Sequence, residues 1–159
     1  MAIDTDKLAL YLVTDPDLCA KFGLIETVQA AVAGRVSIVQ LRDKYATTAQ
    51  LISQAKALQP ILASHNVPLI INDDVEAAIA CDADGIHVGQ DDLDVVRVRQ
   101  KVGPDKIVGL SVETVEAGLR VDAGIVDYVG ISPIFATQTK GDHKPPVGFD
   151  GLADIVTSS

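Results

Sequence analysis

Residues 68–92 read PLIINDDVEAAIACDADGIHVGQDD and contain the pattern that decides the fold. Two apolar runs, 68–72 and 85–88, are short and rich in Ile, Leu and Val, as strands buried on both faces of a sheet should be. Between them, apolar residues recur every three or four positions over 74–81, which is typical of a helix. The stretch therefore predicts two parallel strands joined by a helix.

The same alternation extends along the chain, and we interpret it as six strand-helix units in one domain, 1–159. The predicted strands cover approximately 8–13, 36–40, 68–72, 85–88, 107–110 and 127–131. The predicted helices cover approximately 24–33, 47–64, 74–81, 92–102, 113–122 and 149–157. Thr47 or Thr48 is the expected N-cap of the second helix, and Pro104 lies just beyond the end of another. This order predicts a parallel α/β fold.

Polar side chains follow the predicted strands at the point where each strand ends. They are Gln40, Arg42 and Lys44, then Asn72 and Asp73, then Gln90 to Asp92, then Ser111, and finally Thr137, Thr139 and Lys140 in the long irregular stretch 132–147. Because the carboxyl ends of parallel strands lie on one face, residues far apart in the sequence can converge there on one ligand. The pattern predicts an active site, with 132–147 as its loop.

The overall charge excludes some classes of partner. Thirteen Lys and Arg residues against 22 Asp and Glu residues give a net charge of -9, which repels the phosphates of nucleic acid and anionic membrane surfaces.

Cys19 and Cys81 form no Cys-x-x-Cys pair, and the acidic stretch 1–7 carries no secretion signal. We expect a cytoplasmic protein that is not embedded in a membrane.

The cations suggest a phosphorylated ligand. Arg42 offers a planar fork and Lys44 a point charge, which together suit the oxygens of a pyrophosphate. Thr137, Thr139 and Lys140 suit a phosphate in the same way. The alternative interpretation for both clusters is an ordinary solvated loop.

The carboxylates suggest a metal. Asp73 and Asp92 follow neighbouring strands, and hard oxygen ligands suit Mg²⁺ shared with substrate phosphates. The alternative is that these acids cap helix N-termini. His87 is expected to be a satisfied core or rim histidine, whereas His65 and His143 are expected at the surface. No Ser-His-Asp order, glycine-rich nucleotide fingerprint or Walker loop is present, so a covalent nucleophile is not indicated.

Several motifs together resemble thiamine phosphate synthase in order and spacing. They are YLVTD at 11–15, VQLRDK at 39–44, LIINDD at 69–74, DGIHVGQDD at 84–92, YVGISPIF at 128–135 and TQTK at 137–140, with GFDGL at 148–152. Ser132 and Ala136 are mild departures from the commoner residues of that loop. The resemblance implies a (β/α)8 TIM barrel that joins hydroxymethylpyrimidine pyrophosphate to thiazole phosphate, releasing pyrophosphate and forming thiamine phosphate.

The resemblance also implies roles for particular residues. The pyrimidine pyrophosphate would be held by Gln40, Arg42, Lys44, Asn72, Ser111 and Lys140, the thiazole phosphate by Thr137 and Thr139, and Mg²⁺ by Asp73 and Asp92. The implied reaction is dissociative: pyrophosphate leaves, and the thiazole nitrogen captures the pyrimidine methylene cation. Arg42, Lys44 and Lys140, with magnesium, would stabilise the charge that builds up on the leaving group.

The family's seventh and eighth strands have no counterpart, because the sequence stops at Ser159. We expect an incomplete barrel with its first and sixth strands as unpaired edges, which favours association into a homo-oligomer. Either the chain is part of a longer product or partner chains supply the remainder. Two other functions stay open: a related thiazole tautomerase, and a non-catalytic module that binds the pyrophosphate.

Overall fold

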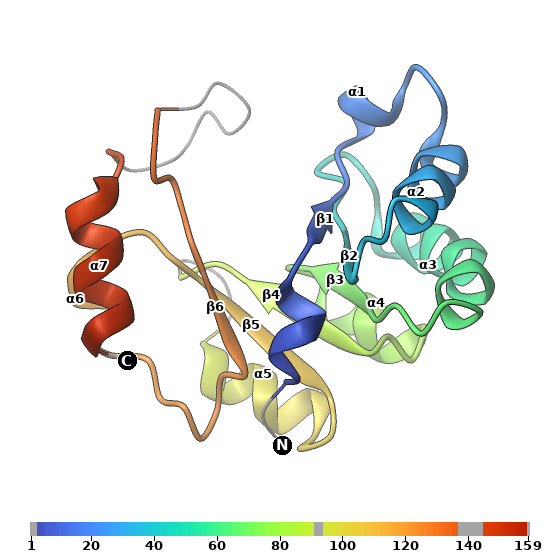
Figure 1. Ribbon diagram of the computed structural model, residues 1–159. Helices are drawn as coiled ribbons and strands as arrows, with labels where there is room; N and C mark the ends of the chain where they lie inside the picture. Colours follow the sequence, from blue (N-terminus) through green and yellow to red (C-terminus); the bar gives the residue numbers. More distant parts are fainter. Residues whose placement is uncertain (1–2, 91–93, 137–144, 159) are drawn as a thin grey trace.

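Six parallel strands form one sheet in a computed structural model that describes residues 3–90, 94–136 and 145–158. The strands are β1 (Tyr11–Val13), β2 (Ile38–Leu41), β3 (Leu69–Asn72), β4 (Gly85–Val88), β5 (Ile107–Val112) and β6 (Tyr128–Ile131). Each strand pairs with its neighbour in the sequence, so the order is β1-β2-β3-β4-β5-β6. The sheet curves into an open half-barrel with helices along its outer side (Figure 1). The predicted parallel α/β fold and its six strands are confirmed.

The helices lie between consecutive strands, except for the last one, which follows β6. They are α1 (Pro16–Cys19), α2 (Leu24–Ala33), α3 (Thr48–Ala63), α4 (Val75–Ala80), α5 (Val95–Val102), α6 (Val115–Gly118) and α7 (Gly148–Ser158), with a 3-10 helix η1 (Thr5–Leu8) before β1. Thr47 caps α3 in a capping box with Gln50, as one of the two expected N-caps. None of the helices in the described part of the chain is long and apolar enough to cross a membrane.

Some boundaries differ from the prediction for local reasons. The strand expected at 8–13 is only Tyr11–Val13, because the Asp4 carboxylate accepts from the Asp6 amide and starts η1 instead. The helix expected at 113–122 is shortened to Val115–Gly118. The helix α1 was not predicted, although its signal is present: Asp15 caps the helix and Pro16 occupies its first turn.

Strand residues alternate between two layers. Val39 and Leu41 of β2 belong to the hydrophobic core between sheet and helices. Gln40, which lies between them, instead lines the cavity inside the half-barrel. The same alternation along β3 places Ile71 against the helices and Asn72 at the cavity. A period of two thus directs every second side chain of a buried strand toward the interior of the half-barrel.

Two aspartates link neighbouring strands by hydrogen bonds at the amino ends of the strands, opposite the carboxyl ends where the site is predicted. The Asp84 carboxylate, just before β4, accepts from the Leu69 amide at the start of β3 (2.8 Å). The Asp127 carboxylate, just before β6, accepts in the same way from the Val108 amide of β5 (2.8 Å) and also pairs with Arg99. These bonds fix the register of the strands that carry the site.

The first and sixth strands are the edges of the sheet, as predicted. They are nevertheless joined across the interior, because the Tyr11 hydroxyl of β1 lies 2.6 Å from the Tyr128 hydroxyl of β6. Their rings are tilted at 49° with centroids 5.8 Å apart.

Candidate active site

The carboxyl ends of the strands surround a cavity of about 580 Å³. Six of the residues predicted from the sequence line it: Gln40, Arg42, Lys44, Asn72, Asp73 and Ser111. They come from β2, β3 and β5 or the loops that follow them. The structure therefore brings these six side chains together, while their roles toward a ligand stay predictions.

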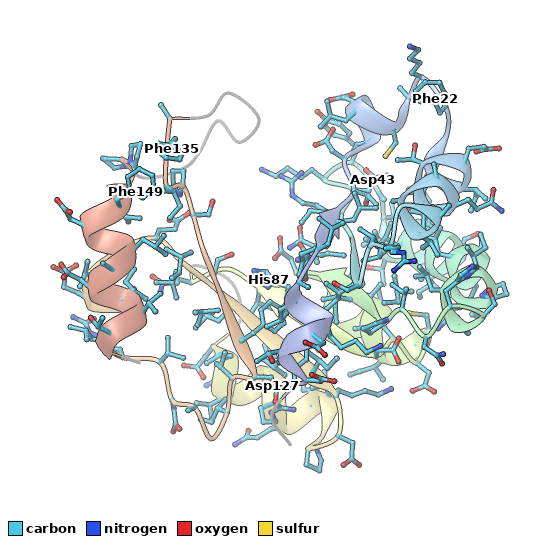
Figure 2. All side chains as sticks on the ribbon, viewed as in Figure 1. Phe22, Asp43, His87, Asp127, Phe135 and Phe149 are labelled. Carbon is cyan, nitrogen blue, oxygen red and sulfur yellow. The ribbon has the colours of Figure 1, made fainter. Side chains whose placement is uncertain are left out.

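The other predicted site residues cannot be placed in the same way. Asp92, Thr137, Thr139 and Lys140 lie outside the described residues. The described part of the predicted loop runs up to Ala136 and resumes at Pro145. At its near end, Phe135 packs edge-on against Phe149 of α7, with ring centroids 5.2 Å apart (Figure 2).

Arg42 is held by two residues of the segment that follows β1. The buried Thr14 hydroxyl donates to the Arg42 carbonyl (3.0 Å) and accepts from the Arg42 amide (2.9 Å). The Asp15 carboxylate accepts from the guanidinium (3.2 Å), and both side chains are mostly buried. The guanidinium is thus oriented before any ligand arrives, which reduces the entropy lost on binding.

Asp73 has an uncommon backbone conformation. Its φ is 62°, in the left-handed region that few residues other than glycine adopt. Its amide donates to the His87 carbonyl (2.9 Å), and its carboxylate accepts from the Asn72 side chain (2.7 Å). Strain of this kind is concentrated at functional sites.

The structure shows which acidic residues cap the helices α4 and α5. Asp74, not Asp73, caps α4 by accepting from the Ala77 amide (2.8 Å). Asp94 caps α5. The capping interpretation is therefore wrong for Asp73, whose carboxylate lines the cavity instead.

The donor atoms beside Asp73 fit magnesium in their chemistry. A carboxylate and the amide side chains of Asn72 and Gln90 line this part of the cavity, and such oxygens are the hard ligands that Mg²⁺ prefers. Among residues 3–90, 94–136 and 145–158, no group of three His, Cys, Asp or Glu side chains is close enough to hold a metal. Magnesium that is also bound by substrate oxygens needs fewer protein ligands than that.

A chain of hydrogen bonds crosses the interior below the predicted ligand residues. The Gln40 amide donates to the Tyr11 hydroxyl (2.8 Å), which contacts the Tyr128 hydroxyl (2.6 Å). His87 then contacts the Tyr128 hydroxyl through Nδ1 (3.0 Å) and the Ser111 hydroxyl through Nε2 (2.9 Å). Figure 2 shows His87 in the middle of the half-barrel, between β1 and β6.

Gln40 and Ser111, at the two ends of this hydrogen-bonded chain, were predicted as site residues, whereas the two tyrosines were not. His87 is buried and hydrogen-bonded, which confirms the expectation of a satisfied histidine. Burial raises the pKa of Tyr128 above its ordinary value, and the Tyr11 hydroxyl adds to this effect. Burial also raises the pKa of Tyr11, although hydrogen bonds with Tyr128 and Gln40 oppose the shift. Both phenols are therefore neutral near pH 7.

This arrangement defines a class of enzyme. The fold is a parallel (β/α) half-barrel, and its polar residues gather at the carboxyl ends of the strands, where barrel enzymes carry their active sites. In a chain of net charge -9, the convergence of Arg42 and Lys44 on one cavity is suited to an anionic substrate.

Comparison with known proteins specifies the family. Residues 10–159 match the family model described as thiamine monophosphate synthase. The thiamine-phosphate synthase of Azorhizobium caulinodans is 51% identical over 146 residues, which are 92% of this chain and 69% of that protein. The one from Albidiferax ferrireducens is 47% identical over 148 residues, 93% of this chain and 68% of that protein.

A solved structure agrees. The thiamine phosphate pyrophosphorylase from Pyrococcus furiosus superposes with a TM-score of 0.85 at 31% identity, covering 96% of this chain and 71% of that one. The chain therefore belongs to the thiamine monophosphate synthase family.

Proposed function

We propose that this chain binds hydroxymethylpyrimidine pyrophosphate and thiazole phosphate in its cavity and joins them into thiamine phosphate, with release of pyrophosphate. The observation that carries the proposal is the meeting of Arg42, Lys44, Asn72, Asp73 and Ser111 around one cavity in a member of this family. The free thiols of Cys19 and Cys81 suit a cytoplasmic enzyme.

The chemical step needs charge stabilisation rather than a nucleophile from the protein. The bond between the pyrimidine methylene carbon and the pyrophosphate oxygen breaks, and its electron pair leaves with pyrophosphate. The thiazole nitrogen then donates its lone pair to the methylene carbon. Arg42, already oriented by Thr14 and Asp15, stabilises the leaving group together with Lys44 and Lys140.

Other residues hold the two reactants in register. Gln40, Asn72 and Ser111 would bind the pyrimidine pyrophosphate, and Thr137 and Thr139 the phosphate of the thiazole. Asp73 and Asp92 would hold magnesium, which when bound supplies positive charge next to the pyrophosphate oxygens.

The direct test measures thiamine phosphate and pyrophosphate formed from both substrates. We expect both products, and neither when either substrate is omitted. Arg42→Met should lower turnover by about 10²-fold or more, as loss of a preorganised charge donor does. Arg97→Met is the matched control, because Arg97 lies on the exposed side of α5. Product formation from one substrate alone, or equal loss in both variants, would contradict the proposal.

Three further variants test the roles of the metal ligands and the loop lysine. Asp73→Asn and Asp92→Asn should each raise the magnesium concentration needed for half-maximal activity, while the exposed Asp105→Asn should not. Lys140→Ala should lower kcat more than it raises KM, because the charge it meets develops only in the chemical step. A chain that binds the pyrimidine pyrophosphate without turnover would instead be the non-catalytic binding module.

A further inference from the structure

The hydrogen-bonded chain that runs Gln40–Tyr11–Tyr128–His87–Ser111 is built into the sheet. A Cβ added at Gly109 would come within 3.0 Å of both the Tyr128 ring and the His87 ring. Gly130 likewise leaves room for His87, whose Cε1 would lie 3.2 Å from a Cβ there. Glycines on β5 and β6 thus make space for these two rings.

The direction of hydrogen-bond donation along this series of side chains is limited by the number of protons that they carry. Tyr11 already accepts from the Gln40 amide, and each neutral phenol has one proton to donate. If Tyr11 donates to Tyr128, then Tyr128 donates to His87 Nδ1, and His87 donates from Nε2 to Ser111. Every link then has one proton, and the Ser111 proton is left over at the cavity.

Hydrogen-bond donation in the opposite direction leaves one hydroxyl proton without an acceptor. If Ser111 donates to His87, His87 to Tyr128 and Tyr128 to Tyr11, the Tyr11 hydroxyl accepts twice. Because the Gln40 amide nitrogen, which is a donor, faces Tyr11, the Tyr11 proton then has no acceptor among the described residues. An unsatisfied donor in a mostly buried position is costly. The direction that starts at Gln40 is therefore favoured.

We propose that Tyr11, Tyr128 and His87 are positioning residues which, through this directed chain, orient the Ser111 hydroxyl as a hydrogen-bond donor toward the pyrophosphate group of the substrate. This rests on the proposed function, since it assigns the ligand group that meets Ser111. The same direction commits the Gln40 amide nitrogen to Tyr11. The Gln40 side-chain oxygen, which has no hydrogen-bond partner among the described residues, is left as an acceptor at the cavity.

Nitrogen-15 NMR of the histidine rings tests the direction without relying on activity. In the whole chain with magnesium and inorganic pyrophosphate, His87 should carry its proton on Nε2 and none on Nδ1. His65→Gln and His143→Gln variants assign the signals. A proton on Nδ1 alone in this complex would overturn the proposal.

A pair of substitutions at His87 tests the link to Ser111. His87→Gln keeps an amide near the position of Nε2, whereas His87→Asn keeps one near Nδ1 and loses the contact to Ser111. We expect His87→Gln to bind pyrophosphate within about threefold of the unchanged chain, and His87→Asn and Ser111→Ala to bind it about tenfold more weakly, as loss of a hydrogen bond to a charged group does. Equal affinity in the two His87 variants would overturn the proposal.

Tyr128→Phe removes the middle hydroxyl of this hydrogen-bonded series with little change in side-chain shape. Tyr45→Phe is its control, because Tyr45 is exposed. Titration calorimetry with pyrophosphate should show about tenfold weaker binding in Tyr128→Phe and no change in Tyr45→Phe. Equal binding in both would refute the positioning role. Failure of the proposed function looks different, because the unchanged protein would then either bind neither pyrophosphate nor the pyrimidine pyrophosphate, or bind them without forming thiamine phosphate.

Discussion

Replacing Arg99 with Met should destabilise the sheet below the site. Arg99 lies on α5, and its guanidinium donates to the carbonyls of Ile125 (3.0 Å), Gly103 (3.0 Å) and Lys106 (2.5 Å). It also pairs with the Asp127 carboxylate (2.6 Å), and the two side chains are only 17% and 10% exposed. Figure 2 shows Asp127 at the end of β6 opposite Phe135.

The magnitude follows from what Arg99→Met leaves behind. The Asp127 carboxylate would remain mostly buried, and among the described residues the Val108 amide would be its one remaining donor. Removing one partner of a buried ion pair typically costs about 3–5 kcal/mol. Because small domains have about 5–15 kcal/mol of stability in total, the variant should lose a large share of it. The loss should destabilise β6 in particular, because Asp127 directly precedes Tyr128, its first residue.

Urea unfolding followed by circular dichroism measures this loss, with Arg97→Met as the exposed control expected to change stability by less than about 0.5 kcal/mol. The double variant Arg99→Met with Asp127→Asn has no buried unpaired charge. It should therefore be less destabilised than the sum of the single changes by about 1 kcal/mol or more. A loss below about 1 kcal/mol in Arg99→Met, or strict additivity, would refute this account of the pair.

Three further results are expected. Asp15→Asn should weaken pyrophosphate binding by calorimetry about three- to tenfold, with little change in unfolding, because it frees the Arg42 guanidinium at the edge of the cavity. Burial raises the pKa of Tyr11 and of Tyr128 above 10.0. The contribution of these two tyrosines to stability should therefore be level below about pH 10 and should fall above it by about 1.4 kcal/mol per pH unit for each tyrosine that ionises only in the unfolded chain. Tyr128→Phe should make that fall less steep in urea titrations at different pH. Gly109→Ala should lower both stability and pyrophosphate affinity, since its Cβ would displace the Tyr128 ring, and an unchanged affinity would show that the ring can move without consequence.

The strands could be predicted because their patterns are local. Runs such as 68–72 and 85–88 become β3 and β4 nearly as predicted, since burial on both faces requires continuous apolar sequence. The residues after them could be assigned to one face, because parallel strands place their carboxyl ends together. Asp73 and Asp74 could not be told apart, since the choice between two adjacent acids depends on the local backbone conformation, here the φ of 62° at Asp73 and the extended backbone of Asp74.

The tyrosine contact could not be predicted from sequence spacing. Tyr11 and Tyr128 are 117 residues apart and lie on opposite edges of the sheet. They meet only because the sheet curves, and curvature depends on twist and on small residues such as Gly109 and Gly130 rather than on any run of letters around either tyrosine. The single signal in the sequence was an aromatic residue with a polar end in each of two predicted strands.

The bond between the first and last strands also has a consequence for how the molecule is made. Each strand pairs with its neighbour in the sequence, so the sheet can grow one unit at a time as the chain leaves the ribosome, amino end first. Contacts between distant residues generally form late in folding, and Tyr11 receives its partner only after Tyr128 has been synthesised. A nascent chain would already carry Arg42 and Lys44 but would lack the histidine and serine orientation that the finished network provides. We therefore expect pyrophosphate to bind with full affinity only after β6 has paired with β5 and Tyr128 has reached Tyr11.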